Sequence, residues 1–156
     1  MVSVVRRLVD VIFKGEPLSP RGVSVTVLIL RVFAGAMMIP YGIGKIEGFE
    51  QYSENFFEDP IGIGMVPSLV LTIFAQVVCS SALVLGLFTR AAAIVLAFNM
   101  LVASRYHLFD DFATLSLPLL FLGIYVVLIL FGGGRYSVDH AIFGRKADNL
   151  NSATLL

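Results

Sequence analysis

The chain has 156 residues, of which 58% are hydrophobic and only 14% are charged, and its mean hydropathy is +0.91. This composition is typical of an integral membrane protein. The 11 basic and 11 acidic residues cancel, and no basic cluster predicts nucleic-acid binding. A single cysteine, Cys79, argues against a thiol oxidoreductase that works through a Cys-x-x-Cys pair.

Residues 1–21 have the pattern of an amphipathic helix. Arg6 and Lys14 fall at helical spacing on one side, whereas Val5 and Val9 fall on the other. Charges interrupt the apolar residues throughout, which is unlike the continuous apolar core of a cleaved signal peptide. We therefore expect a helix that lies in the membrane interface, with a frayed basic tail as the alternative.

Four apolar stretches follow, each close to the roughly 20 residues that a helix needs to cross a bilayer. They lack the period-2 alternation of a membrane β-barrel. The predicted fold is therefore all-α, a four-transmembrane-helix bundle in a single membrane domain over residues 22–131. The predicted spans cover about 22–41, 66–87, 89–106 and 113–131.

The connection between the first and second spans is the one long loop, and it also has an amphipathic pattern. Acidic and aromatic residues each recur in it at helical spacing, with Glu47, Glu50, Glu54 and Glu58 on one face and Phe49, Tyr52 and Phe56 on another. This pattern predicts a short helix on the outer leaflet, with its rings among the headgroups and its acids in water. Such a helix serves either as an interfacial brace or as a lid over a site.

Lysine and arginine residues are distributed unequally between the two ends of the predicted spans. Eight lie on one side, whereas only Lys45 and Arg105 lie on the other, together with seven acidic residues. The positive-inside rule therefore predicts that both termini are cytoplasmic. Residues 132–156 then form a cytoplasmic C-terminal segment.

Three glycines open this segment, so we expect a sharp turn where the fourth span leaves the membrane. Ser137 is placed to cap a short helix that begins near Val138, and Asp139 falls in the first turn of that helix. Asp139 is also a candidate ion-pair partner for Arg90 on the same side of the membrane.

Arg31 places a positive charge near the middle of the first span, where insertion scales give arginine a cost of roughly 2.5 to 3.5 kcal/mol. The nearer interface is too distant for the side chain to reach alone. Gln76, Asn99 and Tyr125 occupy similar depths in the other three spans, which predicts one polar layer inside the bundle. None of these three side chains supplies a negative charge.

Two interpretations of this layer remain open. In the first, the neutral side chains hydrogen-bond the guanidinium group and tie the four helices together. In the second, Arg31, Gln76, Asn99 and Tyr125 bind an oxygen-rich ligand that enters from the lipid. A quinone fits this description, because its ring is flat, its tail is apolar and its two oxygens accept hydrogen bonds. Gly35 and Gly42 lie on the arginine's face of the helix and would leave room for it.

Metal chemistry has few candidate ligands in this sequence. His107 and His140 fall at opposite ends of the predicted spans, so they cannot jointly hold one haem. No haem, metal or covalently bound cofactor is expected.

Three stretches, in this order, resemble the signature regions of the DoxX family of small four-helix membrane proteins: "RVFAGAMMIPYGIGKIEGFE", "ALVLGLFTRAAAIVLAFNMLVA" and "GGGRYSVDHAIFGR". The resemblance covers most of residues 28–144. It assigns family positions to Arg31, Gly42, Lys45, Gly86, Thr89, Arg90, Ser137 and Asp139. Of these, the interpretation as structural covers Gly42, Lys45, Gly86, Arg90, Ser137 and Asp139. Gln76 departs from the family pattern, which commonly has a glutamate there that would pair with the arginine.

The resemblance implies a membrane subunit linked to quinol oxidase or thiosulfate:quinone oxidoreductase complexes, or the membrane part of an oxidative-stress assembly. A shared scaffold does not fix a function. The expectation is a subunit of a redox or respiratory complex in a prokaryotic cytoplasmic membrane that interacts with quinone or quinol and with partner subunits. If it is an enzyme, it is one part of a quinone-linked oxidoreductase complex. The alternative is a non-catalytic scaffold or anchor for partner proteins.

Overall fold

The computed structural model describes residues 19–56 and 62–144, and this part of the chain forms helices and turns without a strand. Four helical segments are long and apolar enough to cross a membrane, which confirms the all-α four-helix prediction and makes the chain a multi-pass membrane protein. The segments are α2 (Pro20–Glu47), α4 (Met65–Ile73) continued by η2 (Phe74–Cys79) and α5 (Ser80–Leu85), α6 (Thr89–Tyr106) continued by η3 (His107–Phe109), and α7 (Phe112–Phe131).

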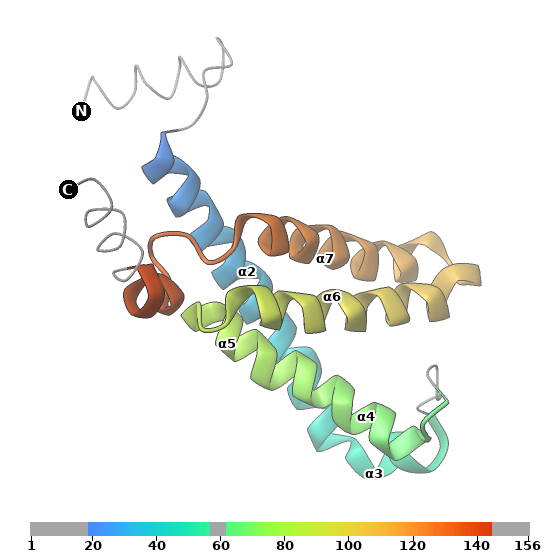
Figure 1. Cartoon of the computed structure of the whole chain (residues 1–156). Helices are drawn as coiled ribbons and strands as arrows, with labels where there is room; N and C mark the ends of the chain where they lie inside the picture. The colour runs from blue at the N-terminus through green and yellow to red at the C-terminus, as the bar shows by residue number, and fades with distance from the viewer. Residues whose placement is uncertain (1–18, 57–61, 145–156) are drawn as a thin grey trace, which may run out of the picture.

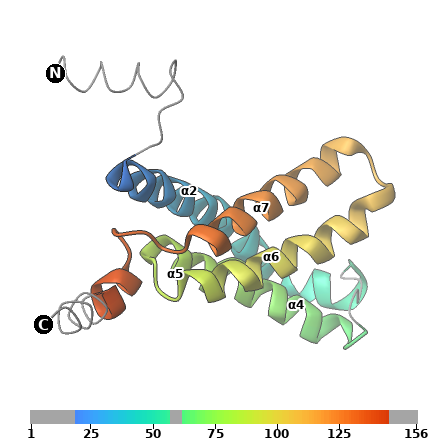
Figure 2. The ribbon, with the colours of Figure 1, turned by 45° about the horizontal axis from the view of Figure 1, so that its top comes forward.

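The four spans are arranged as two pairs (Figures 1 and 2). One pair joins α2 to the segment α4–η2–α5, and the other joins α6 to α7. The pairs lie close together where α5 turns into α6, and they diverge towards the opposite end of the molecule. We call the first end, where α2 and α6 begin and α7 ends, the Arg90 end. The opposite end is called the Lys45 end.

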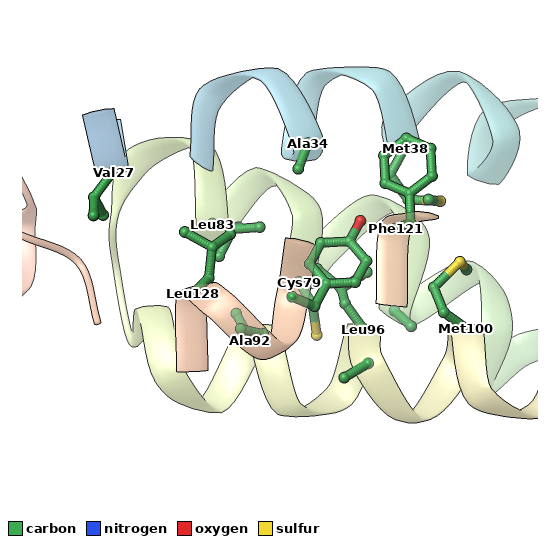
Figure 3. Close-up of a cluster of buried hydrophobic side chains, with 14 residues drawn as sticks. Val27, Ala34, Met38, Cys79, Leu83, Ala92, Leu96, Met100, Phe121 and Leu128 are labelled. Atoms are coloured by element: carbon green, nitrogen blue, oxygen red, sulfur yellow. The ribbon is translucent and has the colours of Figure 1, made fainter. Parts of the chain in front are cut away.

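Every span contributes buried side chains to one apolar core (Figure 3). The labelled members are Val27, Ala34 and Met38 of α2, Cys79 and Leu83 of the second span, Ala92, Leu96 and Met100 of α6, and Phe121 and Leu128 of α7. Most of the other large apolar side chains are exposed on the outside of the bundle, as lipid contact requires.

The second span contacts α2 directly at two glycines. A Cβ atom at Gly35 would lie 2.6 Å from a methyl group of Val84, and one at Gly42 would lie 2.5 Å from a methyl group of Val77. Small residues permit such close helix packing in membranes. The sequence predicts open space beside Gly35 and Gly42 on this face of α2. That prediction is wrong, because the second span fills the space.

A π-helix, η2, interrupts the second span near its middle. Such segments are short and frequently occur at functional sites, because the wider turn changes the direction of the side chains that it carries. Gln76 lies inside η2, next to the close contact at Gly42.

The loop after α2 is helical in its first part, in α3 (Phe49–Gln51) and η1 (Tyr52–Phe56). Phe49 and Tyr52 are half-buried, whereas Glu50 and Glu54 are exposed, which agrees with the two predicted faces.

Several predictions fall on residues outside the described ranges. The amphipathic helix expected over 1–21 lies there almost entirely, since the description begins with Ser19, the N-cap of α2. The C-terminal segment is described as far as η4 (His140–Gly144).

Candidate functional site

Arg31 is buried, with 1% of its surface exposed, as expected for a charge inside the bundle. Its hydrogen-bond partners are not the predicted ones. Nη1 donates to the carbonyl oxygen of Gly133 at 3.0 Å, and Nη2 donates to that of Tyr136 at 2.9 Å. Both carbonyls belong to the turn after α7, where the backbone has left the helix and its oxygens need partners. The predicted bond from Arg31 to Gln76, Asn99 or Tyr125 is therefore wrong.

Asp139 supplies the negative charge that the spans lack, since its carboxylate interacts electrostatically with Arg31. The same carboxylate accepts the backbone N–H groups of Phe88 and Thr89, each at 2.7 Å, at the start of α6. Its own N–H donates to the carbonyl oxygen of Gly86 at 3.0 Å. A carboxylate at a helix N-terminus is stabilised by the exposed N–H groups and by the helix dipole.

The predicted ion pair between Asp139 and Arg90 is not formed. Arg90 instead directs Nη2 to the carbonyl oxygen of Leu130 at 3.4 Å, at the end of α7. Two short bonds from backbone N–H groups satisfy the Asp139 carboxylate without the ordering of a long exposed side chain, which makes them the better partners.

Gly86 lies at the C-terminus of α5 and packs against Arg31. It ends α5 in the left-handed conformation, with φ +75°, and a Cβ atom there would collide with Nη1 of Arg31. Only glycine satisfies both conditions. We call Arg31, Gly86, Thr89, Gly133, Ser137 and Asp139 together the Arg31–Asp139 cluster.

Ser137 holds the turn that carries these carbonyl groups. Its hydroxyl donates to the carbonyl oxygen of Gly134 at 2.7 Å and accepts the N–H of His140 at 3.1 Å. The second contact is the helix cap that the sequence predicts.

A second group of polar side chains is separate from Arg31 and centres on Gln76. The Gln76 amide donates to Asn99 at 3.3 Å, and the Asn99 amide donates to the hydroxyl of Thr72 at 3.3 Å. Gln76 is only 6% exposed, and its oxygen Oε1 has no hydrogen-bond partner among the described residues. Tyr125 is fully buried against Phe121, and its hydroxyl also lacks a partner in that part of the chain. The single predicted layer is therefore divided.

Gln76 lines a pocket of about 320 Å³ towards the Lys45 end, between the two helical pairs. Four other polar residues share this lining, namely Tyr41, Lys45, His107 and Thr114. The apolar part of the wall includes Met38, Met100, Leu117 and Phe121.

Two charged or titratable groups are available in this pocket. Lys45 is half-buried, and its ammonium group makes only a long contact of 3.5 Å with the carbonyl oxygen of Tyr41. His107 uses Nδ1 to contact Oδ2 of Asp110 at 2.7 Å, which leaves Nε2 as the ring nitrogen for a ligand. The pocket thus combines hydrogen-bond donors and acceptors with apolar walls.

Sequence reasoning did not place Tyr41 and His107 in the candidate site, and it interpreted Lys45 as structural. One signal was present, because Tyr41 and Lys45 are four residues apart and share a face of α2. The position of His107 depends on the divergence of the two helical pairs, which no local pattern predicts.

The fold and these contacts define a four-helix membrane protein whose buried arginine is held by the chain segment that follows the last span. A family model described as DoxX matches residues 26–108, more than half of the chain. The chain therefore belongs to the DoxX family. No curated protein and no solved structure matches it.

Proposed function

We propose that this protein is a membrane subunit of a redox complex and that it binds the ring of a quinone or quinol in the pocket at the Lys45 end. The observation that carries the proposal is the amide oxygen of Gln76, which is buried, lines the pocket and has no partner among the described residues. A buried acceptor without a donor costs about 1 to 3 kcal/mol, so a donor supplied by a ligand would stabilise the site.

The lining residues match the chemistry of such a ring. Oε1 of Gln76 can accept a hydrogen bond from a quinol hydroxyl group, and the ammonium group of Lys45 can donate to the other ring oxygen. The volume of about 320 Å³ suits a single ring, with the apolar tail outside in the lipid. When bound, a quinone supplies two-electron chemistry, and partner subunits would exchange those electrons.

His107 is the candidate proton acceptor in the same pocket. Asp110 orients the ring through Nδ1, so Nε2 faces the pocket as the nitrogen that can take a proton from a ring hydroxyl group. His107 and Asp110 both lie at the Lys45 end, which gives the proton a short route to that side of the membrane.

Arg31 is not part of the proposed binding site. Its terminal nitrogens donate to backbone carbonyls of the turn after α7, and Arg31 does not line the pocket at the Lys45 end. This observation favours a structural role for Arg31, and it is also the best support for the second candidate function, a non-catalytic scaffold or anchor for partner proteins.

Photolabelling with a short-chain azidoquinol, whose ring hydroxyl groups can donate to Gln76, tests the proposal in the purified protein. Lys45→Met and Gln76→Leu should each weaken labelling by about tenfold or more, since each removes a hydrogen bond to the ring. Arg105→Gln is the matched control, because Arg105 is an exposed cation at the same end that does not line the pocket. Labelling that is equal in all four proteins, or absent from the wild type, would favour the scaffold.

A further inference from the structure

A second hollow lies at the Arg90 end, and it differs from the proposed quinone pocket in both size and charge. It is an open groove of about 970 Å³ between the first turns of α2, the start of α6 and the turn after α7. The charged side chains that line it are Arg90, Arg135 and Asp139, with His140 beside them.

The balance of charge in this groove is positive. Asp139 is its only carboxylate among the described residues, and both of its oxygens already accept backbone N–H groups. Arg90 is exposed and makes only the 3.4 Å contact to Leu130. Arg135 is exposed, and the buried charge of Arg31 lies beneath the same turn.

One further polar group in the groove wall has no partner within the described ranges. Thr89 is only 1% exposed, and its hydroxyl oxygen Oγ1 makes no hydrogen bond there. Thr89 lines the groove at the start of α6, next to Arg90. The Thr89 hydroxyl therefore has its donor free for a phosphate oxygen of a ligand in the groove.

The groove is also bordered by apolar surface at the level where the spans end. Phe88 is 61% exposed and Phe131 is 58% exposed, and both line it, as does Val23 of α2. Exposed rings at this depth are typical of the boundary between headgroups and acyl chains.

We infer that this groove binds the phosphate headgroup of an anionic lipid, with Arg90, Arg135 and the hydroxyl of Thr89 as its polar contacts and with Phe88 and Phe131 against the acyl chains. Basic pockets between the ends of membrane helices recognise such headgroups through charge and hydrogen bonds. The site would fix the turn after α7 to the start of α6, and therefore support the Arg31–Asp139 cluster from outside.

Thermal unfolding in a neutral detergent tests this inference independently of quinone binding. Cys79 is the only cysteine and is buried, so a thiol-reactive fluorogenic dye reports unfolding directly. Phosphatidylglycerol should raise the unfolding temperature of the wild type, whereas phosphatidylcholine and inorganic phosphate should not. Arg90→Gln combined with Arg135→Gln should abolish most of the shift, with binding about fivefold weaker for each arginine removed.

Arg105→Gln should keep the full shift, because that arginine lies at the opposite end. Replacing Arg90 and Arg135 by lysine should keep part of the rise in unfolding temperature, because lysine keeps the positive charge. This variant therefore shows whether the double Gln variant loses the shift through lost charge or through misfolding. Equal shifts in the wild type and the double Gln variant would overturn the inference. A rise in unfolding temperature of the same size with phosphatidylcholine would also overturn the inference. A rise with inorganic phosphate would overturn the assignment of the ligand as a lipid.

Discussion

At the scale of single residues, the central feature is a buried arginine whose partners are backbone carbonyls and a distant carboxylate. Arg31 and Asp139 are more than a hundred positions apart in the chain, yet they share one cluster with Gly86 between them. Burying a guanidinium group is tolerable only where several oxygens replace its water, and the turn after α7 provides them.

A double-mutant cycle tests this coupling. Arg31→Met should destabilise the protein, because it leaves the Gly133 and Tyr136 carbonyls and the Asp139 carboxylate without the positive charge that they face. Asp139→Asn should lower the free energy of unfolding by about 2 kcal/mol, since hydrogen bonds to a charged acceptor are lost.

Measured by thermal unfolding with the Cys79 dye, the double variant should be less destabilised than the sum of the two single variants. We expect a coupling energy of about 1 kcal/mol or more. Quinone labelling of Asp139→Asn should stay near the wild-type level, because Asp139 is outside the Lys45-end pocket. Strict additivity would contradict an electrostatic interaction between Arg31 and Asp139.

Gly86→Ala tests the close packing of Gly86 against the guanidinium group of Arg31. Alanine must adopt φ +75° and place its Cβ against Nη1 of Arg31, so the free energy of unfolding should fall by about 2 kcal/mol or more. Gly123→Ala is the matched control, because a Cβ at that exposed helical position meets nothing within 4 Å. The control should be neutral or stabilising by up to about 1 kcal/mol.

The sequence predicts the burial of Arg31 but not its partners, and the reason is physical. The hydropathy pattern alone places Arg31 within a span. Exposure of its charge to lipid there is costly, so burial inside the bundle can be predicted from the sequence. Backbone carbonyls are present at every residue, so no sequence pattern marks Gly133 or Tyr136 as acceptors. Their role arises only when the turn after α7 folds back over the bundle.

At the scale of elements, the four spans are predictable because about 20 apolar residues are a sufficient signal for a membrane helix. The π-helix η2 is not predictable in this way, since its bonding register depends on packing against α2. The consequence for the site is direct. η2 carries Gln76, and whether its amide oxygen has a hydrogen-bond partner depends on which side chains of the other helices lie beside it.

Gly42→Ala tests whether the packing of α2 against η2 supports this site. The added Cβ would lie 2.5 Å from a methyl group of Val77 and 3.0 Å from Cβ of Gln76, so the two helices must separate. Overpacking of this kind should cost about 1 to 3 kcal/mol. Gly44→Ala, where nothing lies within 4 Å, is the control and should leave the thermal unfolding temperature unchanged or slightly raised.

At the scale of the whole molecule, the two ends of the bundle differ in shape and in the polar residues that they bring together. The Arg90 end is held closed by the Arg31–Asp139 cluster, which joins α2, α6 and the turn after α7. The helical pairs diverge from there, and the pocket with Gln76 and Lys45 lies in the space between them. A rigid closed end would keep the geometry of the open end constant while a ligand enters from the lipid.

Orientation in the membrane is the last prediction, and it follows from charge. Along the sequence, eight lysine and arginine residues precede the first span, follow the last span or join the second span to the third, and only Lys45 and Arg105 belong to the other connections. The Arg90 end should therefore face the cytoplasm. In a Cys79→Ser background, Glu50→Cys should react with a membrane-impermeant maleimide in intact cells. Arg135→Cys should react only after the membrane is opened.

The two test positions are suited to this comparison because both side chains are exposed and lie beyond opposite ends of the spans. The Cys79→Ser parent should stay unlabelled throughout. The reverse pattern would place the Lys45 end in the cytoplasm, and the proton route through His107 and Asp110 would then lead inward. With the predicted orientation, a proton taken from a ring hydroxyl group would leave on the outer side, because His107 and Asp110 lie at the Lys45 end.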